Sequence, residues 1–116
     1  MELPYERRSL YCNDEREALL TIWPPGVESP IHDHGNSRGW GEVLEGEIEE
    51  ERFVRGIGPV CTVYRAGERF KETPDTIHII RNPSPTCRAV VLHVNTPPLT
   101  LQAMRRFSRE DTTAWT

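Results

Sequence analysis

Two histidines stand one residue apart within residues 29–37, the segment with the clearest potential for chemistry. In an extended strand the side chains of positions i and i+2 point to the same face. His32 and His34 can therefore direct both imidazoles at one point, while Asp33 faces the other way. Two converging imidazoles suit a single metal ion. The alternative is two surface histidines in a polar loop, so other parts of the chain must distinguish the two interpretations.

The remaining two histidines, His78 and His93, each have apolar neighbours in a segment that is predicted as a strand. A single histidine in such a strand is commonly a hydrogen-bonded core residue. Here all four histidines are expected at inward-facing strand positions. Three imidazoles with open coordination positions would make a catalytic site for zinc, iron, copper or nickel, and the ligand set leaves these metals as alternatives.

Short strands are the elements that must position these residues. Ten prolines and eight glycines interrupt the chain often, which favours an antiparallel sandwich or small barrel. The interior of such a barrel suits histidines that point inward from several strands. A short helix is expected over residues 99–107. Strands are expected over residues 17–23, 31–36, 40–44, 47–54, 60–64, 77–81 and 87–94.

Length and composition indicate one domain, residues 1–116, of an ordinary soluble protein. The net charge of −4 comes without a basic stripe, so nucleic acid is not an expected partner. The apolar runs are too short for a bilayer, and residues 1–8 lack an apolar signal core, so a cytoplasmic protein without a membrane partner is expected. Cys12, Cys61 and Cys87 form neither a disulfide framework nor a structural zinc motif and are expected as partly buried free thiols.

An acidic run extends from residue 42 to residue 51. A second metal site is one interpretation of this run, but a solvated sheet face is the favoured one. The acidic residues are Glu42, Glu45, Glu47, Glu49, Glu50 and Glu51.

The order of these features resembles the cupin superfamily. Its first motif has a glycine, five residues and His-x-His, as Gly26, His32 and His34 stand here, and Gly46 closes it. The position that usually holds a metal-binding glutamate is Gly39. The resemblance therefore implies a metal bound through three histidines only. A looser second motif is formed by Gly67, Pro74, His78 and Asn82.

Within the cupins, the chain is most similar to the bacterial cysteine dioxygenases (type I) of the thiol dioxygenase branch, over about residues 5–98. The resemblance implies a small antiparallel jelly-roll barrel in which His32, His34 and His78 hold a mononuclear Fe(II). A small thiol would bind the iron through sulfur and amine beside O2, and both oxygen atoms would pass to sulfur. The matching segments are residues 23–26, 30–37, 43–46, 77–82 and 92–98.

The family binds the substrate carboxylate with an arginine that shortly follows a tyrosine. Tyr5 and Arg7 stand at the matching distance before His32, and Tyr5 is carried over as a catalytic residue. The guanidinium of Arg7 suits this role because its N–H fork pairs bidentately with a carboxylate. Arg8 is the alternative, since a shift of one residue would exchange the two.

The family's Ser-x-His-x-Tyr triad is only partly present. Val91, His93 and Asn95 occupy its positions, so the histidine alone is kept. The cross-linked Cys–Tyr thioether cofactor of animal enzymes cannot form, because Gly39 and Asn95 replace its two residues. Asn95 is expected to bind substrate by a hydrogen bond. His93 is a candidate acid or base, with a structural core histidine as the alternative.

These observations favour an iron-dependent thiol dioxygenase that converts L-cysteine to its sulfinate, as a monomer or homodimer. The altered triad predicts weakened cysteine oxidation, a different mercapto-acid substrate or a different reaction. The alternative is a metal-binding cupin that binds a small ligand without oxidising thiols. A metal hydrolase or isomerase is the least favoured, because no carboxylate is predicted to be well placed near the histidines.

Overall fold

Buried and half-buried side chains alternate along strand β2 (Glu17–Trp23), so that every second residue is buried. Leu19 and Trp23 are apolar members of the buried set, but Glu17 and Thr21 are polar and equally inaccessible. Buried polar groups require hydrogen-bond partners. The inner face of this strand is therefore partly core and partly the wall of a polar site.

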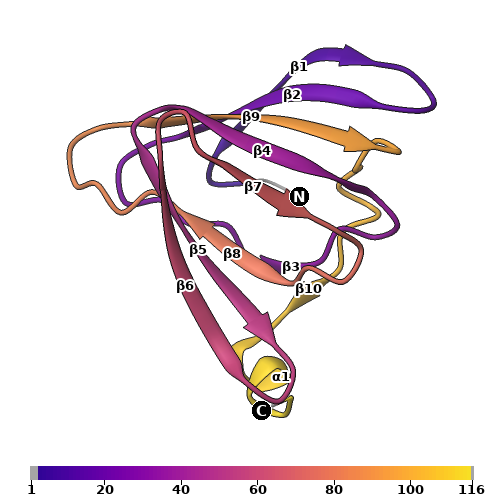
Figure 1. Cartoon of the computed structure of the whole chain (residues 1–116), viewed down its shortest axis with the longest axis vertical. Coiled ribbons are helices and arrows are strands. Elements are labelled where there is room, and N and C mark those ends of the chain that lie inside the picture. Colours follow the sequence, from indigo (N-terminus) through magenta and orange to yellow (C-terminus); the bar gives the residue numbers. More distant parts are fainter. Residues whose placement is uncertain (1–2, 116) are drawn as a thin grey trace.

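The computed structural model describes residues 3–115 and consists of two five-stranded antiparallel sheets that face each other (Figure 1). This arrangement confirms the expected all-β barrel. The first sheet has the order β1 (Glu6–Cys12), β2, β9 (Ala89–Thr96), β4 (Arg38–Glu45) and β7 (Arg69–Glu72). The second has the order β10 (Arg106–Phe107), β3 (Ile31–His32), β8 (His78–Arg81), β5 (Glu47–Val54) and β6 (Gly58–Arg65).

All seven expected strands are present, and the bounds of six of them coincide with the expected bounds or differ from them by at most two residues. The exception is residues 31–36, where only Ile31–His32 is strand. Strands β1, β7 and β10 were missed. Six of the seven residues of β1 are exposed, so this edge strand lacks the apolar alternation by which a strand is recognised.

The expected helix over residues 99–107 is wrong. This segment forms a turn followed by β10, which pairs with β3, and the helix α1 (Arg109–Thr113) comes later. Ser108 caps α1, since its hydroxyl accepts from the N–H of Asp111 while the Asp111 carboxylate accepts from the N–H of Ser108. This reciprocal cap is a typical helix start, and it explains the position of the helix.

The main hydrophobic cluster joins both sheets. Val91 is fully buried in it, at the position where the triad of the resembled family has a serine. A second cluster of Ile31, Phe53 and Ile79 is covered by Phe107 and Trp115 from the C-terminal segment. The first cluster consists of Trp23, Val43, Ile48, Phe70, Ile80, Ala89 and Val91.

Asn82 connects three chain segments at the end of β8. Its buried Nδ2 donates to the carbonyl oxygens of Trp23 (3.0 Å), Pro24 (3.3 Å) and Cys87 (2.8 Å). Its Oδ1 accepts from the N–H of Ser84 at 3.0 Å. The side chain thus holds both the turn after β2 and the loop before β9, which brings β2 and β9 into register.

Replacing Asn82 by alanine should lower the free energy of unfolding by about 3 kcal/mol, because it leaves several buried polar groups unpaired at about 1–3 kcal/mol each. Urea denaturation measures this difference. Asn13 is the matched control, since its side chain is likewise bonded to the backbone, where it accepts two N–H bonds, but it lies exposed in the β1–β2 turn. Asn13→Ala should cost less than about 1 kcal/mol; an equal loss in both variants would contradict the role given to Asn82.

Two further expectations concern the surface and the membrane. Cys12, Cys61 and Cys87 are free, but they are exposed rather than partly buried. Among residues 3–115, no helix has the length and apolar character needed to cross a membrane.

Candidate metal centre

Three histidines converge between the two sheets. His32 ends β3 and His78 begins β8, where the two are register partners, and His34 follows β3 by two residues. The ring centroids lie 4.7–5.1 Å apart. One potential ligand atom from each residue falls within 4.8 Å of the others, and all three side chains are buried. The predicted set of three histidines therefore does meet at one point.

Each of these rings is held in place through Nδ1. His32 Nδ1 bonds the carbonyl oxygen of Pro30 at 2.9 Å, and His34 Nδ1 bonds that of Thr76 at 3.0 Å. Since a carbonyl can only accept, both Nδ1 atoms carry a proton, which leaves Nε2 as the nitrogen that can bind a metal. Such bonds to the second ring nitrogen are what fixes metal-ligating histidines.

His78 is held in the same way by a carboxylate, because Glu50 Oε2 accepts from its Nδ1 at 2.6 Å. Arg52 donates to the same oxygen at 2.9 Å. Burial raises the pKa of Glu50, but the contacts with His78 and Arg52 lower it more strongly, so the net shift is downward. The expected solvated face of the acidic run is thus wrong for Glu50, and for Glu51, which is also buried and pairs with Arg81.

The free nitrogens of the site fit a metal ion. His34 Nε2 is fully buried and makes no hydrogen bond, its one close polar contact being the ion pair with Glu72, and a buried nitrogen without a hydrogen bond suits a metal ligand. Burial, followed by the neighbouring His78 and His34, lowers the pKa of His32 to about 3. Burial also lowers the pKa of His78. Both rings are therefore neutral at pH 7, which is the form that binds metals.

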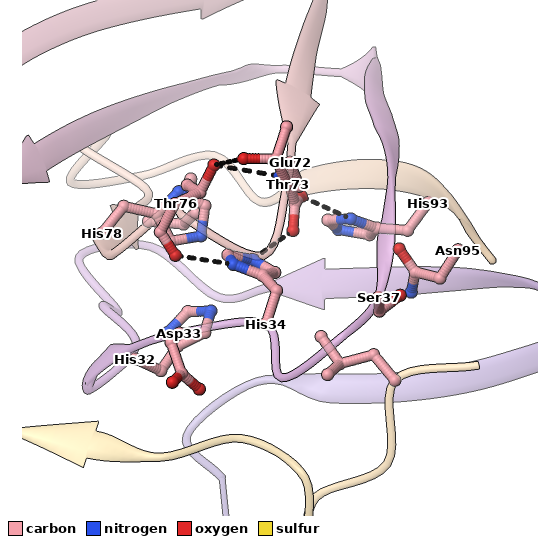
Figure 2. Close-up of polar contacts among 12 residues, drawn as sticks. His32, Asp33, His34, Ser37, Glu72, Thr73, Thr76, His78, His93 and Asn95 are labelled. Atoms are coloured by element: carbon pink, nitrogen blue, oxygen red, sulfur yellow. Dashed lines mark hydrogen bonds and ion pairs between the residues drawn. The ribbon is translucent and has the colours of Figure 1, made fainter. Parts of the chain in front are cut away.

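Glu72 is a residue of this site that the sequence interpretation missed. It ends β7 and is buried beside the histidines, with Oε2 at 2.5 Å from His34 Nε2 and Oε1 at 3.1 Å from His93 Nδ1 (Figure 2). Burial lowers the pKa of His34, but Glu72 more than offsets this and raises it. The expectation that no carboxylate lies near the histidines is wrong. Strand β7 buries Phe70 and Glu72, but with four residues it is too short for this alternation to be recognised in the sequence.

The backbone at position 39 explains why the carboxylate near the histidines belongs to Glu72 on β7 and not to a residue of β4. Gly39 on β4 is paired on one side with Glu72 and on the other with Asn95. A Cβ atom built on Gly39 would lie 1.8 Å from the carbonyl oxygen of Val94, a distance that no real contact allows. The slot therefore accepts no side chain in this backbone, whether glutamate or cysteine.

A polar chain runs from the barrel wall to Glu72. Trp23 Nε1 donates to Thr21 Oγ1 at 2.8 Å, and this hydroxyl lies 3.0 Å from His93 Nε2. Because the carboxylate of Glu72 accepts from His93 Nδ1, the Nε2 atom accepts from Thr21. Thr21 is the register partner of Val91. A hydroxyl from the neighbouring strand thus contacts His93, although position 91 itself carries none.

The other candidate residues line one small cavity beside the histidines, of about 40 Å³. Arg7 reaches it and donates from Nη2 to the carbonyl oxygen of Leu99 at 2.9 Å, whereas Arg8 is exposed and pairs with Glu6. Tyr5 stacks on Trp23 at 3.9 Å between ring centroids. The lining residues are Tyr5, Arg7, Leu19, Thr21, Trp23, His32, Glu72, His78, Ile80, His93, Asn95, Leu99 and Met104.

Asn95 borders this cavity but is already engaged. Its Nδ2 donates to Glu17 Oε2 at 3.3 Å, and the same oxygen accepts from the N–H of Leu99 at 2.5 Å. The structure therefore brings Tyr5, Arg7, His93 and Asn95 to the wall of the metal centre, with the Asn95 amide turned towards Glu17 by this bond.

Comparisons with known proteins match both the sequence and the fold. The family model for cysteine dioxygenase type I matches residues 4–110. An uncharacterized protein with a double-stranded β-helix domain from Klebsiella pneumoniae is 20% identical, with a TM-score of 0.71 over 90% of this chain and 85% of that chain.

Two further solved structures share the same fold. KdgF from Halomonas sp. is 16% identical, with a TM-score of 0.69 over 84% of this chain and 87% of its own. Oxalate oxidase in complex with the substrate analogue glycolate is 22% identical, with a TM-score of 0.66 over 78% of this chain and 45% of its own. At these identities the structural likeness establishes the double-stranded β-helix fold.

Proposed function

The chain belongs to the cysteine dioxygenase type I family, whose members are metal-dependent oxygenases of the cupin fold, and we propose that it is an iron-dependent dioxygenase of small carboxylated thiols. L-cysteine is the leading substrate, with other small mercapto-acids next. The observation that carries this proposal is that His32 and His78, two of the three converging histidines, line the same small cavity as Arg7. A metal-binding face beside a carboxylate-binding group suits a thiol acid.

His32, His34 and His78 would hold the iron through Nε2, since each Nδ1 is engaged with a fixed acceptor. A ferrous ion bound there would supply coordination positions for the thiol and the redox chemistry with O2. The burial of the site favours this chemistry, because a dry cavity protects a reactive centre from water.

Arg7 would bind the substrate carboxylate. Its bond to the Leu99 carbonyl holds the guanidinium at the cavity wall, and the five N–H groups of an arginine leave further donors for a carboxylate. Tyr5 would assist as a hydrogen-bond donor, since burial raises the pKa of its hydroxyl and keeps it protonated.

His93 would act as a positioning residue rather than an acid or base. Both of its ring nitrogens are engaged within the protein, with Thr21 and with Glu72. Asn95 would reach the substrate only if its amide gave up its bond to Glu17.

The second candidate is a metal-binding cupin that binds a small ligand without oxidising thiols. Asn95 stands where the family has a tyrosine, so the phenol hydroxyl that would orient the substrate is absent. The Asn95 amide is also bound to Glu17, and both features favour this second candidate. This candidate keeps the three-histidine metal site and the Arg7 clamp but lacks turnover.

Oxygen uptake by the iron-loaded protein separates the two candidates. We expect oxygen consumption, with sulfinate as product, when L-cysteine or a small mercapto-acid is added, and none without a thiol or without iron. If no small thiol gives a sulfinate while the iron is fully loaded, the dioxygenase proposal is wrong. Saturable ligand binding under those conditions would then support the second candidate.

A further inference from the structure

The carboxylate of Glu72 contacts His34 at Nε2, the ring nitrogen that faces the other histidines. Oε2 lies 2.5 Å from His34 Nε2, yet Nε2 has no hydrogen-bond partner, because the contact lacks the alignment of an N–H···O bond. A protonated His34 would point its Nε2–H along a bond to this carboxylate. The contact instead lacks that alignment, which fits two ligands of one ion better than a donor and its acceptor.

The distances agree with a shared ion. Two ligand atoms at about 2.0–2.1 Å from one metal and at right angles to each other lie roughly 3 Å apart. The observed 2.5 Å requires only a small separation of Oε2 from Nε2. Oε1 meanwhile accepts from His93, so one carboxylate oxygen is held within the protein and the other faces the histidines.

The backbone also provides for this arrangement. Glu72 is the register partner of Gly39, the position at which the resembled cupin motif would carry its glutamate. No side chain fits at position 39, because a Cβ atom would meet the carbonyl oxygen of Val94. Glu72 therefore reaches the centre from the adjacent strand β7, next to Gly39, which has no side chain.

We propose that Glu72 is a fourth protein ligand of the metal, so that the centre is formed by three histidines and one carboxylate. This inference rests on the proposed three-histidine metal centre. It replaces the three-histidine-only site that the sequence implied.

The additional ligand has a consequence for the substrate class. A six-coordinate ion with four protein ligands has two positions left, which is enough for a thiol sulfur and O2 but not for a substrate amine as well. The centre would therefore accept mercapto-acids that lack an amine as readily as L-cysteine. Carboxylate recognition by Arg7 is unaffected, because it does not involve the metal.

Metal binding in the absence of thiol and O2 tests the ligand directly. Glu72→Gln should weaken the binding of Co(II) by at least about 100-fold, which is the upper end of the loss typical of outer contacts, and it should change the visible absorption spectrum because an anionic ligand is lost. His93→Gln is the matched control, since it removes a contact of Glu72 outside the proposed ligand set. It should weaken binding by no more than about 10-fold and leave the spectrum of bound Co(II) unchanged. Equal losses in both variants would mean that Glu72 acts only by positioning, and the proposal would be overturned.

A second measurement keeps the proposal testable if Glu72→Gln fails to fold. In a crystal structure of the wild-type protein loaded with Co(II) or Zn(II), Oε2 of Glu72 should lie within about 2.0–2.2 Å of the ion. A distance beyond about 3 Å would overturn the ligand role. Because neither measurement uses a thiol, a protein that binds metal through Glu72 and oxidises no thiol would refute the dioxygenase proposal alone.

Discussion

Replacing His78 by alanine should abolish stoichiometric metal binding and reduce thiol-dependent oxygen uptake to background. His78 is the one proposed ligand from β8, where it lies opposite His32 on β3. Loss of contacts outside the ligand set costs about 10–100-fold in metal affinity, so loss of a ligand should cost at least about 100-fold. Elemental analysis of the purified variant and titration with Fe(II) or Co(II) measure this loss.

His93→Ala is the control for this experiment, because it removes the fourth histidine from the same cavity wall while the three converging rings remain. It should retain one metal per chain. The stability of both variants without metal can be compared by urea denaturation, so that loss of metal is not confused with loss of fold. A His78→Ala protein that still binds one metal per chain with unchanged affinity would contradict the three-histidine centre.

Replacing Arg7 by alanine should raise the KM for carboxylated thiols by about 10–100-fold, since a hydrogen bond to a charged group contributes about 1.5–3 kcal/mol. The KM for cysteamine, which has no carboxylate, should change by less than about threefold because it gains nothing from the guanidinium. The kcat should change less than KM, since Arg7 binds a part of the substrate that does not react. Steady-state oxygen uptake with each thiol measures all of these values.

Arg8→Ala is the matched control for Arg7, because the neighbouring side chain is exposed and pairs only with Glu6 among the contacts at this position. It should leave the KM of every thiol nearly unchanged. Equal effects of Arg7→Ala on carboxylated thiols and cysteamine would refute the carboxylate clamp, as would a larger effect of Arg8→Ala.

The sequence predicts the histidine centre well because local geometry and strand pairing both act in its favour. The spacing of His32 and His34 predicts that their rings converge, and they do so although His34 lies just beyond strand β3; the fold then brings His78 opposite His32. Strand β2 is also predictable, because buried and half-buried residues alternate along it and the apolar Leu19 and Trp23 mark its buried face.

The missed features depend on pairings between distant strands. Glu72 lies on the four-residue strand β7, which is too short to show a period, and its role follows from the register of β7 with Gly39. Likewise Thr21 contacts His93 only because β2 pairs with β9. The sequence indicates that Gly39 and Val91 lack the side chains of the known motif. Only strand pairing in the folded barrel shows that Glu72 and Thr21 lie next to these positions.

The isotopic composition of the product tests the central claim most directly. The iron-loaded protein is incubated with L-cysteine or a mercapto-acid under ¹⁸O₂, and the product is analysed by mass spectrometry. The proposed dioxygenase should give a sulfinate in which both new oxygen atoms are ¹⁸O. A product that carries no ¹⁸O, or disulfide as the only oxidised thiol, would contradict the account.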